Sequence, residues 1–126
     1  MVGPHPVLIG TPWIDLGEQI AGWVRALGYE ARLTPDAMEA VAWARRGPFA
    51  ASFLDSQWGG AGGEPIWRVV RPILGRRMIL MARERSNELW FEALQVGVGT
   101  VLPLPPAERM VRAALAAVDA SPSDGS

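Results

Sequence analysis

Asp55 is the residue whose position suggests chemistry, because it directly follows the apolar run 49–54. Such a run is typical of a strand that is buried on both faces, so Asp55 would lie at the open carboxyl end of a strand. From the residues alone, its carboxylate could cap the following turn or pair with Arg83. The glycine-rich loop 59–63 could admit a phosphate, but it lacks the Gly-Lys-Ser/Thr ending of a P-loop and follows the wrong strand for a dinucleotide site. We expect a connector there.

Several kinds of site are excluded by missing residue types. The chain has no Cys, which rules out disulfides, thiol redox chemistry and thiolate metal sites. All twelve basic residues are Arg, so no mechanism can use a lysine ammonium group. The only histidine, His5, lies between two prolines near the N-terminus, which makes a Ser-His-Asp relay a poor prospect. No residue set matches a hydrolytic or redox enzyme, and we expect that the protein is not an enzyme.

The charge balance argues against nucleic acid and membranes as partners. Twelve basic and 13 acidic residues give a net charge of −1, so no general attraction to polyanions is expected. The basic pairs are expected at helix ends and strand flanks rather than on a nucleic acid; they are Arg45-Arg46, Arg76-Arg77 and Arg83/Arg85. The apolar runs are far shorter than the ~20 residues of a membrane span. The N-terminal residues 1–6 lack the features of a signal peptide, so a cytoplasmic location is expected.

Short apolar runs alternate with amphipathic segments along the chain. The runs predict five strands, at 6–10, 29–33, 49–54, 78–82 and 100–102. The segments between and after them carry apolar residues at helical spacing. They predict five helices, at 15–27, 35–46, 65–71, 87–96 and 106–118.

Local signals predict where the first two helices begin and end. Asp15 and Glu18 have the spacing of a capping box, which would start the first helix. Gly28 would end it. Thr34-Pro35-Asp36 combines a cap, a proline at the first helical position and an acid in the first turn.

Two prolines are expected to shape the later helices. Pro72 should break or kink the third helix, because it lacks an N–H group and clashes with the preceding turn. Pro106 is expected to start the last helix. The proline-rich stretch 102–106 is therefore not interpreted as a peptide ligand.

This alternation predicts an α/β fold with a doubly wound, five-stranded parallel sheet covered on both faces. Right-handed crossovers and the three most apolar runs favour the strand order 2-1-3-4-5. We expect one domain over 6–119 and a disordered tail over 120–126.

Several spacings together resemble the CheY-like receiver domains of bacterial response regulators. The best-matching parts are Phe53-Leu54-Asp55 on the third strand, Gly63 eight residues later and Gly97 before the last strand. The stretch 102–106 occupies the place of the Leu-x-Lys-Pro segment of that family. The resemblance covers 6–118, nearly the whole chain.

The resemblance implies a phosphoryl acceptor at Asp55, served by a histidine kinase, with Mg²⁺, an acidic pair, a Ser or Thr and a Lys around it. Only the acceptor is kept in this sequence. The acidic pair falls on Thr11 and Pro12, the hydroxyl position on Met81 and the Lys position on Leu104. We therefore expect a degenerate receiver, or pseudo-receiver, with no metal and no cofactor at Asp55.

The first functional hypothesis is a signal-transduction module that binds a protein partner, or a second copy of itself, without phosphorylation. The surface that the family uses is formed by the fourth helix, the fifth strand and the fifth helix. In this sequence it includes Asn87, Trp90, Leu104, Arg109 and Arg112.

Two alternatives remain open at this point. One is a phosphorelay regulator that is phosphorylated on Asp55 despite its atypical site. The other is a flavodoxin-like binder of a small molecule, in a crevice lined by Thr11, Asp55, Trp58 and Met81. Trp58 and Trp90 could each anchor a partner or simply pack.

Overall fold

The computed structural model describes residues 5–59, 64–83, 87–95 and 97–120; for 87–90, 119 and 120 it gives the backbone only. Arg85 and Gly63, and the part of the expected tail from 121 onward, lie outside the described residues. Ala120 itself is the last residue of the final helix.

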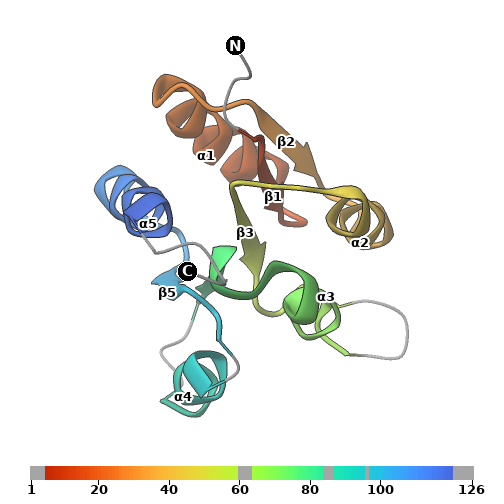
Figure 1. Ribbon diagram of the computed structural model, residues 1–126. Helices are drawn as coiled ribbons and strands as arrows, with labels where there is room; N and C mark the ends of the chain where they lie inside the picture. Colours follow the sequence, from red (N-terminus) through yellow and green to blue (C-terminus); the bar gives the residue numbers. More distant parts are fainter. Residues whose placement is uncertain (1–4, 60–63, 84–86, 96, 121–126) are drawn as a thin grey trace.

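Five strands and five α-helices alternate along the chain (Figure 1). The strands are β1 (Val7–Gly10), β2 (Ala31–Thr34), β3 (Ala51–Asp55), β4 (Met78–Ala82) and β5 (Thr100–Pro103). The helices are α1 (Ile14–Ala26), α2 (Ala37–Arg46), α3 (Ile66–Leu74), α4 (Asn87–Gln95) and α5 (Glu108–Ala120), with a 3-10 turn, η2 (Gly75–Arg77), after α3. All strand pairs are parallel and their order is β2-β1-β3-β4-β5, so the predicted fold and topology are confirmed.

The sheet separates two apolar layers. Every residue of β1, β3 and β4 is buried, which explains why these strands are continuous apolar runs in the sequence. Helices α1 and α5 pack on one face of the sheet, and α2, α3 and α4 pack on the other (Figure 1). Among the described residues, no helix is long and apolar enough to cross a membrane.

The register gathers the functional candidates at one edge of the sheet. Gly10 pairs with Leu54, Asp55 with Met81 and Ala82 with Pro103, so these strands end side by side. We name this the carboxyl edge. The segments that lead into β3, β4 and β5 lie at the opposite edge, which we name the amino edge.

Two predicted helix starts are wrong. The N-cap of α1 is Trp13, with no side-chain hydrogen bond, so Asp15 and Glu18 form no capping box. The N-cap of α2 is Asp36, whose carboxylate accepts hydrogen bonds from the N–H groups of Met38 and Glu39. Thr34 ends β2 instead, and its hydroxyl oxygen accepts from the N–H of Asp36 at 3.0 Å.

The helix ends are mixed in outcome. Gly28 follows the end of α1 with a φ of 95°, a conformation that favours glycine, as predicted. Pro72 does not end α3, which continues to Leu74. The proline lies two residues before the end of α3 at an exposed position, and its nitrogen cannot donate the helical hydrogen bond to the carbonyl of Arg68. The prediction that Pro106 starts α5 is wrong as well. The first hydrogen bonds of α5 are accepted by the carbonyl of Ala107, and the helix begins at Glu108.

Candidate functional site

Asp55 lies at the end of β3 and is 4% exposed. One of its carboxylate oxygens accepts a hydrogen bond from the backbone N–H of Gln57 at 3.0 Å. Its backbone carbonyl accepts from the N–H of Trp58 at 3.2 Å. None of the three ion pairs found in the described part of the chain includes Asp55. Its carboxylate therefore caps the turn that follows the strand.

Thr11 and Pro12 lie beside it, after β1, in the place of the missing acidic pair. Thr11 is fully buried, and its hydroxyl oxygen accepts from the backbone N–H of Trp13 at 3.2 Å. Pro12 is exposed and has no side-chain oxygen. Among the described residues, no three His, Asp or Glu side chains gather into a group that could hold a metal. One carboxylate and one hydroxyl fit Mg²⁺ poorly, since this ion demands a near-ideal octahedral set of oxygens.

Arg83, the nearby cation, has a different neighbour from the one considered from the sequence. Its guanidinium carbon lies 4.7 Å from the ring centroid of Trp13, in a cation–π contact. Trp13 is 51% exposed, so the contact is at the surface. The expected alternative, an Arg83–Asp55 ion pair, is absent from the described residues.

The two other positions of the degenerate pocket are apolar and used in packing. Met81 lies opposite Asp55 in the sheet and is buried in the layer of α1 and α5. Ala82, the last residue of β4, is apolar as well. Leu104 packs against the same layer, and its N–H donates to the carbonyl of Ala82 at 3.0 Å. Met81, Ala82 and Leu104 therefore offer Asp55 no side-chain hydrogen-bond donor.

Trp58 is part of the core rather than an exposed anchor. It is 7% exposed and packs into the layer of α2 and α3. Its indole ring lies against the backbone of Gly10 at the end of β1. The four residues of the suggested crevice, Thr11, Asp55, Trp58 and Met81, are all buried.

The second candidate site is the face formed by α4, β5 and α5. Two apolar side chains of α4, Phe91 and Leu94, are 63% and 44% exposed. Asn87 and Trp90 belong to the same helix, but their side chains lie outside the described residues. Ala93 and Leu94 are both apolar residues at helical spacing, but only Ala93 is buried. Phe91 was missed from the sequence, although an apolar residue beside those at helical spacing was the signal for it.

The α5 side of this face is charged and exposed. Arg109 is exposed, and Arg112 pairs with Glu108 one turn before it at 3.0 Å. On the other flank, Arg68 of α3 holds Glu92 of α4 at 2.8 Å. The face thus joins exposed apolar side chains on α4 to exposed charges on α5, a mixture that is common at protein interfaces.

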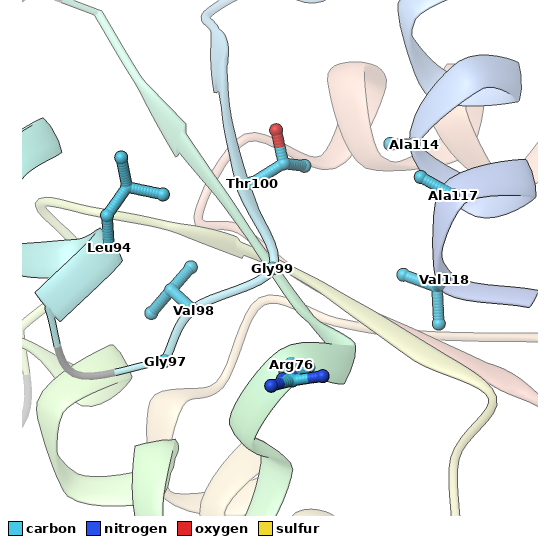
Figure 2. Close-up of a pocket in the computed structure, with 9 residues that line it drawn as sticks. All are labelled: Arg76, Leu94, Gly97, Val98, Gly99, Thr100, Ala114, Ala117 and Val118. Atoms are coloured by element: carbon cyan, nitrogen blue, oxygen red, sulfur yellow. The ribbon is translucent and has the colours of Figure 1, made fainter. Parts of the chain in front are cut away.

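A hollow of about 270 Å³ lies on this face where it reaches the amino edge of the sheet. Figure 2 shows that it spans from Leu94 on α4, across the start of β5, to Val118 on α5. Its lining residues are Arg76, Leu94, Gly97, Val98, Gly99, Thr100, Ala114, Ala117 and Val118. Because β5 is the edge strand of the sheet, the hollow opens where the sheet has no further strand beside it.

No family model matches the sequence, and no curated protein matches it either. Solved structures do match its fold. Chemotaxis protein CheY4 of Vibrio cholerae is 22% identical, with a TM-score of 0.77 over 91% of this chain and 98% of that chain. The receiver domain of NtrX from Brucella abortus is 19% identical, with a TM-score of 0.76 over 91% and 99%.

A third similar structure, the receiver domain of the Francisella response regulator 1452, is 15% identical, with a TM-score of 0.77 over 91% of this chain and 97% of that chain. In each case the match runs through almost the full length of both chains. The strand order and the two-layer helix arrangement agree with it. This chain therefore has the fold of the CheY-like response regulator receiver domains.

Proposed function

We propose that the protein is a cytoplasmic signal-transduction module that binds a protein partner, or a second copy of itself, without phosphorylation of Asp55. The docking surface is the α4-β5-α5 face. Binding, rather than catalysis, is its activity.

The surroundings of Asp55 carry this proposal. A phosphoryl group on Asp55 would add nearly two negative charges at a buried position. The side chains that would have to respond are those of Met81 and Leu104, which can neither donate a hydrogen bond nor pair with a charge. The guanidinium of Arg83 lies over Trp13 instead. A modification that interacts equally with two conformations cannot shift the balance between them.

The exposed apolar side chains of α4 support the choice of surface. Interface energies are usually dominated by a few aromatic or Arg side chains. Phe91 is 63% exposed, and Arg109 is exposed on the neighbouring helix. The hollow between Leu94 and Val118 adds a recess that a partner side chain could fill (Figure 2).

The test compares variants of the two candidate sites. We expect Phe91→Ala and Trp90→Ala to weaken association by about tenfold or more, as removal of a hot-spot side chain does. Asp55→Ala should leave it within about twofold, because no exposed contact is lost. Sedimentation velocity measures self-association, and affinity capture followed by mass spectrometry measures a heterologous partner.

Met38→Ala is the matched control, because Met38 is 64% exposed but lies on α2, away from this face. It should bind like the wild type. Loss of binding in Asp55→Ala, with Phe91→Ala and Trp90→Ala unaffected, would reverse the proposal. It would favour the alternative in which phosphorylation of Asp55 controls the protein.

A further inference from the structure

A second recess, of about 290 Å³, lies at the amino edge, at the opposite end of the sheet from Asp55. It is formed where α2 and α3 end and where the chain enters β3. Its lining residues are Ala44, Arg45, Arg46, Gly47, Pro48, Phe49, Ile73, Leu74 and Arg77. We name it the arginine pocket. Three of its nine lining residues are Arg and none is acidic, so its charge has one sign.

Within the described part of the chain, the three guanidinium groups have no carboxylate partner. Arg45, Arg46 and Arg77 take part in none of the ion pairs found among the described residues. All three are exposed. Arg77 makes one weak contact, from a guanidinium nitrogen to the carbonyl of Phe49 at 3.4 Å. Asp55, the acid of the adjoining strand, lies at the far end of β3.

Compensation of the helix dipoles accounts for only part of this charge. Two helices, α2 and α3, end at the pocket, and each C-terminus carries the equivalent of about −0.5 charge. Together they balance about one of the three guanidinium charges. A surplus of about two positive charges remains at one edge of a chain whose net charge is −1. One phosphate dianion would balance that surplus.

The wall of the pocket suits the uncharged part of a small molecule. Phe49 is buried at its base, Pro48 adjoins it and Ile73 is half exposed at its rim. Each guanidinium group can donate two parallel hydrogen bonds to two oxygens of a phosphate group. A single carboxylate can accept such a pair of hydrogen bonds from one Arg at most. We propose that the arginine pocket binds the phosphate group of a small phosphorylated molecule. This site is independent of the α4-β5-α5 face and of Asp55.

The test titrates the full chain with two probes, inorganic pyrophosphate and phenyl phosphate, and measures affinity by calorimetry. Amide chemical shifts of residues 45–47, 49, 76 and 77 locate the site. We expect saturable binding that Arg46→Gln and Arg77→Gln each weaken by about tenfold or more, because each loses charge-assisted hydrogen bonds. Arg25→Gln, which removes an exposed guanidinium on α1, on the other face of the sheet, should change the affinity by less than about twofold.

Arg77→Gln also removes the contact to Phe49, so thermal unfolding is measured for every variant; Arg46→Gln involves no such contact. No saturable binding by either probe at millimolar concentration would overturn the proposal. So would an equal loss in Arg25→Gln, which would indicate unspecific attraction to net charge. Pocket-dependent binding of a short single-stranded RNA without binding of either probe would also overturn it, since it assigns the pocket to a macromolecule.

Discussion

Trp58 and Gly10 meet at the carboxyl edge without room for one more carbon. A Cβ atom built on Gly10 would lie 2.4 Å from a ring carbon of Trp58 and 2.8 Å from a methyl carbon of Leu54. Both neighbours are buried, so neither can move away freely. Gly10 is therefore required by packing, since its φ is not among the positive values of the chain.

We predict that Gly10→Ala lowers the free energy of unfolding by roughly 1–3 kcal/mol, the usual cost of overpacking a core. Gly22→Ala is the matched control, because Gly22 lies within α1 and its Cβ would meet nothing within 4 Å. There the free energy should rise by about 0.5–1 kcal/mol, from the better helix propensity of Ala. Urea unfolding followed by circular dichroism measures both. Equal effects of the two substitutions would contradict this account of Gly10.

Among the elements, α1 and α2 begin in different ways. Asp36 caps α2 through two backbone N–H groups, at 2.9 Å and 3.4 Å. Asp15 lies in the first turn of α1 without a capping hydrogen bond, so it acts only through the helix dipole.

Asp36→Ala should therefore lower the free energy of unfolding by about 1 kcal/mol, the typical loss of a side-chain N-cap. Asp15→Ala should lower the free energy of unfolding by only about 0.3 kcal/mol, and added salt should abolish this small loss, because salt screens the interaction with the helix dipole. Denaturant unfolding at low and high salt distinguishes the loss of a capping hydrogen bond from the loss of a helix-dipole interaction. A cost for Asp15→Ala as large as that for Asp36→Ala would mean that α1 has a capping interaction after all.

For the whole molecule, the two apolar layers share the strands of one sheet. Side chains of β1, β3 and β4 alternate between the layer of α1 and α5 and the layer of α2, α3 and α4. Loss of the helices of either layer would expose strands that also form part of the other layer. We infer a single cooperative unit.

Leu115→Ala tests this inference, because Leu115 is 3% exposed in the layer of α1 and α5. We expect a loss of about 2–5 kcal/mol in the free energy of unfolding. Tryptophan fluorescence, to which Trp58 and Trp67 of the opposite layer contribute, should shift to the same urea midpoint as circular dichroism. Two separate midpoints would show that the layers unfold independently.

Local patterns in the sequence determined the order of the elements, the buried strands, the sheet topology and the position of Asp55 at the carboxyl edge. These features depend on the period of the apolar residues, which neighbouring residues display directly. The first residue of a helix was harder to predict. The sequence predicts caps at Asp15 and Thr34, whereas α1 begins after Trp13 without a side-chain cap and α2 is capped by Asp36.

Only the tertiary structure decided which distant side chains meet. Arg83 lies over Trp13 rather than beside Asp55, and Trp58 packs against Gly10. The arginine pocket brings Arg45 and Arg46 together with Arg77, about thirty residues later in the chain. No periodicity encodes such meetings, because they depend on sheet register and on where helices end in space. The sequence therefore determined the scaffold of this protein, whereas packing between segments decided its sites.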